Sequence, residues 1–413
     1  MKLWNGGITT VPAEIVRCGT KEQVAAVVRR TVDAGLPLSV RGGGHDWAGR
    51  AVREGGVVID LSPMNRVAVS GDVAHVGGGA TSLDVMEAAV TAGQTVVTGT
   101  SGSVGMAGLA LGGGYGPQLG SAGLACDQIV GAQVVLADGS TVTAPDDLLR
   151  ALRGGGGNFG VVTELHLRLR PFATALTGAI LFPWAQAHQV LHAWASVLAD
   201  VPDELAVQVG SLTGPDGARV IAANPTWVGP APEGRHWVRV VEGWGTPLVS
   251  QVASLPLTET LRATDELFPA DGRSWHLRTR NLPALTPEVI GLLVEAGSSA
   301  PPGAAFGMHH FHGRATRPVL PSAFGQRAPH LMLELITSWR EPAESHLGWS
   351  RDLGEALAGH ALPGGYPNVL GPDDTDQIER AWGPDAARLL EAKAKYDPHN
   401  VFRGIPLPRA GTP

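Results

Sequence analysis

The first 170 residues combine two hydrophobic patterns. Apolar residues recur every three or four positions in residues 21–34, as they do on one face of a helix. Short apolar runs of the strand type follow at residues 36–40, 57–61, 73–76, 95–98, 129–137 and 161–169. Asp138-Gly139, after the run at 129–137, is a dipeptide typical of a hairpin turn. The pattern predicts an α/β domain that ends near Pro171.

The rest of the chain differs in composition. Glycine clusters stop before Ala173, and most of the tryptophans lie beyond it. Strand candidates at residues 205–212, 219–223 and 331–339 are separated by helical runs, which suits an α+β layer with one open sheet face. After Gly364, a loop leads to a helix predicted for residues 373–395. We therefore predict boundaries that divide the chain into residues 1–172, 173–362 and 363–413.

Composition and charge limit the possible partners. At 413 residues, the chain is long enough for two hydrophobic cores and an enclosed site. Its hydrophobic residues, 44%, and charged residues, 17%, are typical of a globular protein rather than a disordered one. A net charge of -7 without any basic run argues against nucleic acid or an anionic membrane as a partner. Because no leader and no run of about 20 apolar residues is present, we expect a cytoplasmic protein.

Glycine is concentrated in four clusters, which suggests close contact between backbone and ligand. They lie at residues 42–44, 77–79, 112–114 and 154–157. Backbone N–H groups in such loops can bind a pyrophosphate, so a dinucleotide cofactor is a reasonable expectation. Gly155, Gly157 and Gly160 fit the pattern G-x-G-x-x-G, but they precede a predicted strand instead of following one. A Rossmann-type NAD site is therefore not predicted.

Six motifs follow one another in an order that is informative as a set. They are Val40-Arg41-Gly42-Gly43-Gly44-His45; the glycines at 105, 108 and 112–114 with Tyr115-Gly116; and residues 123–127, 157–164, 366–368 and 396–402. In this order they resemble the motifs of the berberine-bridge-enzyme-like branch of FAD-linked oxidases. The resemblance covers nearly the whole chain, more loosely between residues 173 and 325.

The resemblance implies an α+β fold with a PCMH-type FAD-binding domain. Residues 1–172 and 363–413 would bind FAD, and residues 173–362 would form an inserted substrate domain with an antiparallel sheet and helices. FAD would be bonded through its 8α-methyl carbon to His45. The residues expected to contact FAD are Arg41, Gly42, Gly43, Gly44, His45, Thr98, Ser101, Val104, Gly105, Gly108, Leu109, Gly112, Gly113, Gly114, Tyr115, Gly116, Gly160, Val162, Tyr366 and Asn368.

Two positions in the expected FAD loop affect the flavin chemistry. Ser101 stands where many relatives carry a cysteine that forms a second bond to the flavin, so a single covalent link is expected. The resemblance places Val104 at the family's gatekeeper position beside the flavin, where a small side chain would leave room for oxygen. Cys126 lies in a different motif and is assigned no flavin bond. Cys126 and Cys18 are both predicted to be buried, because two cysteines make neither a disulfide framework nor a zinc site.

The strand predicted at residues 331–339 carries a candidate catalytic base. Period-two alternation places Met332, Glu334 and Ile336 on one face, and a carboxylate among aliphatic residues is costly unless it is paired or functional. Glu334 aligns with the family's Glu or Gln that faces the flavin, and desolvation would make it a usable base. The alternative is a salt bridge with a residue such as Arg327. Tyr366, in a loop expected beneath the substrate, is the second catalytic candidate or a packed structural ring.

The segment Met308-His309-His310-Phe311-His312 raises the question of a metal site. His310 and His312 would share a strand face, but no third ligand has a recognisable spacing, so no metal is predicted. We expect His310, His312 and Met332 to line the substrate pocket instead.

The sequence thus predicts an FAD-dependent oxidase of a small, hydrophobic molecule of the secondary-metabolite type. It would remove a hydride from a C–H group next to OH, N or an aromatic ring, and pass the electrons to molecular oxygen to give hydrogen peroxide. Two alternatives are open: an oxidase of a small sugar or alcohol, and a catalytically idle flavin-binding protein. The sequence predicts no oligomeric state.

Overall fold

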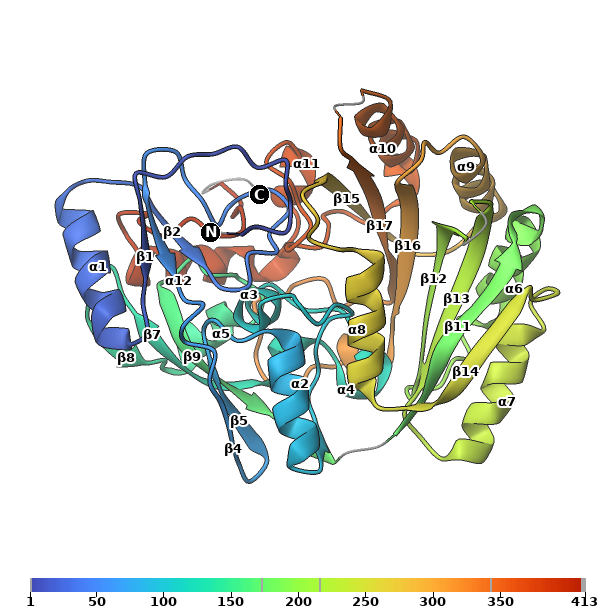
Figure 1. Ribbon diagram of the computed structural model, residues 1–413, viewed down its shortest axis with the longest axis horizontal. Coiled ribbons are helices and arrows are strands. Elements are labelled where there is room, and N and C mark those ends of the chain that lie inside the picture. Colours follow the sequence, from blue (N-terminus) through green and yellow to red (C-terminus); the bar gives the residue numbers. More distant parts are fainter. Residues whose placement is uncertain (1, 172–173, 215–216, 342–343, 410–413) are drawn as a thin grey trace.

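The computed structural model describes residues 2–171, 174–214, 217–341 and 344–409. Figure 1 shows two lobes side by side. The left-hand lobe, here the first lobe, holds strands β1 to β10 and the C-terminal segment, and the right-hand lobe, the second lobe, holds strands β11 to β17. The two ends of the described chain both lie on the first lobe.

Three small sheets form the first lobe. A parallel sheet has the order β1 (Glu14–Arg17), β3 (Val57–Asp60) and β2 (Leu38–Arg41). An antiparallel sheet has the order β4 (Val67–Ser70), β5 (Val73–Gly77), β9 (Val161–Arg168), β7 (Ile129–Val135) and β8 (Thr141–Thr143). A short antiparallel pair consists of β6 (Gln94–Thr95) and β10 (Arg170–Pro171).

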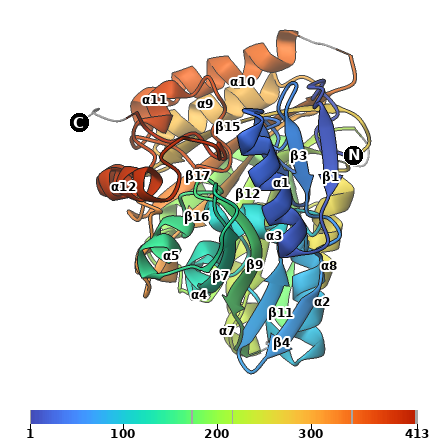
Figure 2. The same cartoon turned by 90° about the vertical axis from the view of Figure 1, so that its left-hand side faces the viewer.

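Helices pack around these sheets. In the N-terminal part they are α1 (Lys21–Asp33), α2 (Ser82–Thr91), α3 (Met106–Leu111), α4 (Leu119–Ala122) and α5 (Asp146–Leu152). The C-terminal segment adds α11 (Thr375–Ile378) and α12 (Ala386–Tyr396). Figure 2 shows α1 lying across the parallel sheet and α12 at the outer edge of the lobe. Residues far apart in the sequence therefore build one lobe together.

One antiparallel sheet of seven strands forms the second lobe. Its order is β14 (Val249–Leu255), β11 (Ala175–Pro183), β13 (Arg219–Trp227), β12 (Leu205–Thr213), β16 (Ala304–Phe311), β17 (His330–Trp339) and β15 (Ser274–Leu282). Its outer face is covered by α6 (Ala187–Val197), α7 (Ala231–Glu242), α9 (Pro287–Ser298) and α10 (Glu344–Ala356). Helix α8 (Leu257–Leu267) lies on the inner face, between the lobes.

The alternation along β17 determines which side chains face the first lobe. Leu331, Leu333 and Leu335 belong to the core shared with the outer helices, whereas Met332 belongs to the core of the first lobe. Glu334 has the same parity as Met332 and is paired with Gly307 of β16. The expected common face of Met332 and Glu334 is therefore confirmed, and it is the inner one.

Most of the predicted elements are present, with three corrections. The α+β class is confirmed, as is the hairpin turn, where Gly139 has a φ of 77°. The strand predicted at residues 95–98 ends at Thr95. The single helix predicted for residues 373–395 is wrong, because Gly383, with a φ of 47°, and Pro384 separate α11 from α12. Strands β1, β4, β11, β14 and β15 are among those that were not predicted.

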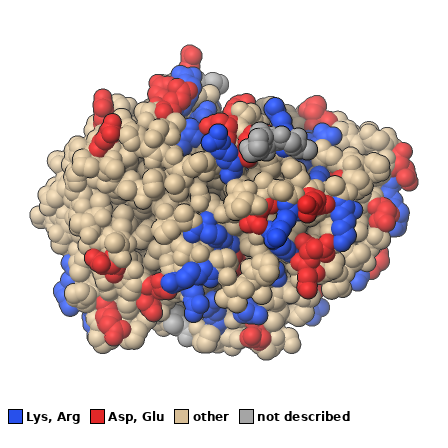
Figure 3. Space-filling model, turned by 180° about the vertical axis from the view of Figure 1, so that it is seen from behind, with Lys and Arg blue, Asp and Glu red and all other residues tan. Residues whose placement is uncertain are grey.

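Charge is unevenly distributed over the back of the molecule. In Figure 3, acidic and basic side chains intermingle over the right-hand part of the view, whereas the middle of the left-hand part is largely uncharged. Within the described ranges, no helix has the length and apolar character needed to cross a membrane.

The division of the chain into domains at residues 172 and 362 remains a prediction.

Candidate active site

A cavity of about 280 Å³ opens in the first lobe, mainly where four chain segments meet. The segments lie within residues 38–51, 104–111, 156–162 and 402–405. Several of the residues predicted to contact FAD line this cavity: Gly42, Gly43, Gly44, His45, Val104, Gly105, Gly108, Leu109, Gly160, Val162 and Asn368. Two glycine loops form one wall, because a Cβ added to Gly43 or Gly105 would overlap the backbone of the other loop.

The cavity has features that fit an FAD molecule held against the backbone. A Cβ at Gly108 or Gly157 would meet no atom within 4 Å, so a side chain there would occupy ligand space. The Oγ atom of Ser39 is buried and, among the described residues, has no hydrogen-bond partner. A buried hydroxyl is costly without a partner, so a ligand group at this point would satisfy it.

Other residues expected to contact FAD support the cavity from behind. Arg41 pairs with Asp60 at 3.0 Å, and the hydroxyl of Thr98 donates to the carbonyl of Gly99. A Cβ at Gly112 would meet Asn368, and one at Gly113 would meet the ring of Tyr366. These glycines therefore allow tight packing of the loop, and the structure gives them no place in the cavity wall.

His45 is held by a chain of hydrogen bonds that crosses between the lobes. Its Nε2 lies 2.8 Å from the Oγ of Ser103, and that hydroxyl donates to Asp265 of α8 at 2.7 Å. The hydroxyl proton of Ser103 is donated to Asp265, so the proton in the hydrogen bond between Ser103 and His45 is the one on Nε2 of His45. The Nδ1 atom of His45 is therefore unprotonated. Burial lowers the pKa of His45 to about 4, and Asp265 opposes this shift. The ring is therefore neutral at pH 7, and Trp4 stacks on it.

The same carboxylate also binds Ser101. The Ser101 hydroxyl donates to Asp265 at 2.5 Å, and the backbone N–H of Ser103 donates at 3.1 Å. Ser101 does not line the cavity; its hydroxyl instead joins the FAD loop to α8. Cys126 is buried and unbonded to another cysteine, as is Cys18, which confirms the expected burial of both.

Tyr366 is fixed by two donors. Its hydroxyl accepts hydrogen bonds from the backbone N–H of Gly114 and from Nδ2 of Asn368, both at 2.9 Å. Burial raises the pKa of Tyr366 far above its ordinary range. The ring of Tyr115 lies 4.6 Å from that of Tyr366, and its hydroxyl lies 3.0 Å from Nε2 of His330. Both tyrosines are buried between the cofactor cavity and the inner face of the sheet.

A second cavity, of about 440 Å³, lies between α8 and the inner face of the seven-stranded sheet. Thr100 and Gly116, which lie in the predicted FAD loop of the first lobe, contribute to its wall. The FAD loop therefore lies between the two cavities. Its apolar lining includes Leu119, Ala179, Val207, Leu255 and Leu267. Its polar side chains include Gln208, Asn224, Gln251, Glu259, His309 and His310.

Glu334 stands beside this second cavity and is paired with one of its histidines. Its Oε2 lies 3.8 Å from Nε2 of His309, which is also 3.3 Å from Nε2 of Gln208. The side chain of Glu334 is 19% exposed. Arg327, the alternative partner, binds both carboxylate oxygens of Asp127, at 2.7 and 3.0 Å. The proposed salt bridge between Glu334 and Arg327 is therefore absent from the described contacts.

Two of the expected substrate residues are placed elsewhere. His310 lines the second cavity, and burial lowers its pKa to about 3. His312 lies beyond the end of β16, where its ring stacks on His310 and faces the carbonyl of Pro202. Met332 is packed into the core of the first lobe. Among the described residues, neither His312 nor Met332 contributes to the wall of either cavity.

The sequence interpretation missed several residues of both cavities. Ser39 and the segment 402–405 flank motifs that were recognised, so their position could have been inferred. His309 lies within the histidine cluster. The pairing of β16 with β17 sets His309 opposite Met332, near Glu334, whereas His312 lies beyond the end of β16. Asp265 had no signal, because it lies in the loosely similar part of the chain.

Comparison with known proteins agrees with this architecture. The FAD binding domain family matches residues 12–145, and the "Berberine and berberine like" family matches residues 365–404. The FAD-linked oxidoreductase aurO of Gibberella zeae is 33% identical over 421 residues, covering 98% of this chain and 82% of that protein. The (R)-6-hydroxynicotine oxidase of Paenarthrobacter nicotinovorans is 39% identical over 210 residues, covering 49% and 46%.

Solved structures share the fold over nearly the whole chain. The crystal structure of 6-hydroxy-D-nicotine oxidase from Arthrobacter nicotinovorans has a TM-score of 0.87 and 27% identity, and covers 97% of this chain and 93% of that one. A berberine-bridge-enzyme-like protein of Physcomitrella patens also has a TM-score of 0.87, with 23% identity and coverage of 98% and 94%. The PCMH-type, FAD-binding prediction is confirmed. The chain belongs to the berberine-bridge-enzyme-like family of FAD-linked oxidoreductases.

Proposed function

We propose that this FAD-linked oxidoreductase is an oxidase of a small, mainly hydrophobic molecule, with FAD bonded to His45 and Glu334 as the proton acceptor. The observation that carries the proposal is the position of Glu334. It is a carboxylate on the inner face of the sheet, paired with His309 in the wall of a largely apolar cavity. Oxygen would take the electrons and give hydrogen peroxide.

The first cavity supplies what a covalently held flavin requires. Gly42 to Gly44, Gly105 and Gly108 would let FAD approach the backbone, and His45 offers a neutral ring with Nδ1 unprotonated. FAD, when bound, supplies the acceptor for a hydride. A single link through His45 is proposed, because Ser101 occupies the place of the second attachment residue and is bonded to Asp265.

The second cavity would bind and orient the substrate. Its leucine, valine and alanine side chains favour an apolar body, and the amides of Gln208, Asn224 and Gln251 can bind one or two polar groups. The relative that acts on 6-hydroxynicotine, a nitrogen heterocycle, supports a substrate whose reacting C–H group adjoins nitrogen, oxygen or an aromatic ring.

Glu334 would accept the proton that the substrate loses from OH or N–H as the hydride leaves. His309 lines the cavity and its Nε2 lies 3.8 Å from the carboxylate, so it would hold Glu334 in place or relay the proton. Tyr366 would donate a hydrogen bond to the substrate, because its hydroxyl oxygen accepts from Gly114 and Asn368 and its own proton is not used in these two bonds. Its side chain is fixed before the substrate binds, which limits the reorganisation that the reaction needs.

An oxidase of a small sugar is the second candidate. The amide-rich part of the cavity wall is the observation that favours it, because amides bind sugar hydroxyls. A screen for peroxide release with amines, phenols, alcohols and simple sugars separates the two candidates. A catalytically idle flavin protein would release no peroxide with any of these donors.

Replacement of Glu334 by Gln tests the catalytic assignment. With an active donor, anaerobic flavin reduction should slow by about 100- to 10,000-fold, the usual contribution of a positioned base, while flavin content stays the same. The matched control is Glu355→Gln, an exposed carboxylate on α10, which should reduce at the normal rate. If Glu334→Gln lowers the melting temperature and leaves reduction unchanged, Glu334 is only a structural partner of His309.

A further inference from the structure

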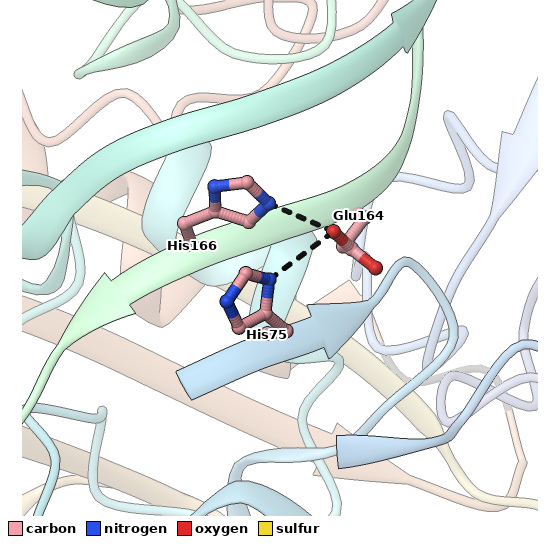
Figure 4. A group of neighbouring side chains, drawn as sticks. All are labelled: His75, Glu164 and His166. Carbon is pink, nitrogen blue, oxygen red and sulfur yellow. Dashed lines mark hydrogen bonds and ion pairs between the residues drawn. The ribbon is translucent and has the colours of Figure 1, made fainter. Parts of the chain in front are cut away.

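His75, Glu164 and His166 form a three-residue cluster on the five-stranded sheet of the first lobe. His75 lies on β5, and Glu164 and His166 lie on the neighbouring strand β9. Figure 4 shows the carboxylate of Glu164 facing both imidazole rings. Its Oε1 is 2.7 Å from Nε2 of His166 and 3.4 Å from Nδ1 of His75, and the three ligand atoms lie within 4.8 Å of one another.

The strand register brings these side chains together. His75 is directly paired with His166, and Glu164 precedes His166 by two residues, so all three project from one face. Leu165 and Leu167 alternate into the core on the opposite face. The side chains are 39%, 41% and 21% exposed in the order His75, Glu164 and His166, which leaves them open to solvent and to an ion.

Gly131 positions the ring of His166. This glycine lies opposite His166 on β7, and a Cβ there would stand 2.5 Å from Nδ1 of the histidine. The ring therefore lies over the backbone of Gly131 and turns its Nε2 toward Glu164. A site whose ligands are oriented by their surroundings loses less entropy when it binds an ion.

We propose that His75, Glu164 and His166 bind a divalent late-transition-metal ion such as Zn²⁺, with water completing its coordination. Two imidazoles and one carboxylate are the donor set that such ions prefer, and they are poor ligands for Mg²⁺ or Ca²⁺. Ligand atoms around tetrahedral Zn²⁺ are about 3.4 Å apart, given bond lengths of about 2.0–2.2 Å. The distance between Nδ1 of His75 and Oε1 of Glu164 is 3.4 Å and already matches this value. The Nε2 atom of His166, now 2.7 Å from the same oxygen, would need to move away from it by less than about 1 Å.

This site is independent of the proposed reaction. The three ligands contribute to neither cavity wall, and they are separate from the histidines at 309, 310 and 312. A metal ion here would join β5 to β9, the strands that continue into Gly78 and start at Val161 in the cofactor cavity. It would therefore stabilise the sheet that supports the FAD site.

The test is a zinc titration of chelator-stripped, flavin-loaded protein against a chromophoric zinc indicator. One Zn²⁺ should bind per chain, and His166→Gln, Glu164→Gln and His75→Gln should each weaken binding by at least about 10- to 100-fold, the effect of losing even an outer-shell group. Gly131→Ala should weaken it too, although it removes no ligand. Retained flavin absorbance shows that each variant is folded.

A second pair of histidines makes a stringent control. His188 and His192 lie one turn apart on the exposed side of α6 and could bind zinc by themselves. The double variant His188→Gln/His192→Gln should keep the high-affinity ion. If that variant abolishes zinc binding, or if His166→Gln binds zinc as the wild type does, the proposal is wrong. Absence of any binding by the wild type at about 100 μM zinc overturns it as well.

Discussion

The neutral state of His45 predicts that the proposed bond between His45 and FAD forms almost as fast at pH 5 as at pH 7. A bond to carbon requires the neutral imidazole. Because burial lowers the pKa of His45 to about 4, the ring takes up a proton only as the pH falls through 4. At pH 5 about 90% of His45 is neutral, whereas a histidine with an ordinary pKa of about 6.5 would be about 3% neutral. The two cases differ by about 30-fold in rate.

The assay uses flavin-free protein from riboflavin-starved cells. FAD is added at pH 5, 6 and 7, samples are precipitated with acid at intervals, and the flavin that remains in the pellet is the covalent fraction. His45→Ala should retain none and can report the affinity for free FAD at each pH. Ser103→Ala removes the hydrogen bond to Nε2 and leaves the ring buried, so it should slow attachment and keep the flat pH profile.

A fall of about 25-fold in the attachment rate between pH 7 and 5, with an unchanged affinity for free FAD, would refute this reasoning. It would mean that His45 is open to solvent when FAD binds. If wild-type protein loses all its flavin on acid precipitation at every pH, the covalent link itself is absent.

Two further predictions concern oxygen and acid. Val104 lines the cofactor cavity, so Val104→Leu should slow the reoxidation of reduced flavin by oxygen in stopped-flow mixing, and an unchanged rate would exclude this side chain from the oxygen path. Burial lowers the pKa of His330 to about 4 and that of His310 to about 3, below the values of the unfolded chain near 6.5. Below about pH 6.5 the unfolded state therefore binds more protons than the folded state. The stability that these histidines contribute should be fully present above about pH 6.5, and the free energy of unfolding should decrease as the pH falls toward 4. Calorimetry at pH 7.5, 6 and 5 measures this, and a constant melting temperature would contradict it.

The sequence predicts best where a pattern is local. Period-two alternation placed Glu334 and Met332 on one face of β17, because neighbouring residues of a strand always point to opposite sides. The same pattern could not say how far a side chain is from a ligand. Met332 has the expected direction, but the core of the first lobe covers it, and only the packing of two lobes decides that.

Contacts between distant segments could not be predicted. Asp265 reaches Ser101 and Ser103 from a helix that lies more than 160 residues further along the chain. Neither segment carries a pattern that reports the other. His312 was expected to line the pocket, but β16 ends at Phe311, and the backbone then turns the ring toward Pro202. Strand ends are set by tertiary contacts more than by the residues themselves.

The position of residues 402–405 has a consequence for protein synthesis. They complete the wall of the cofactor cavity, Gly404 donates to Asn158, and the carbonyl of Arg403 accepts from Arg53, which is 350 residues earlier. A ribosome needs about 20 to 70 s to add that many residues. During this interval the nascent chain already carries the His45 loop, but the cavity is open on one side. Lasting capture of FAD should therefore follow the synthesis of residues 402–405, and chains truncated before Phe402 should lack the cofactor.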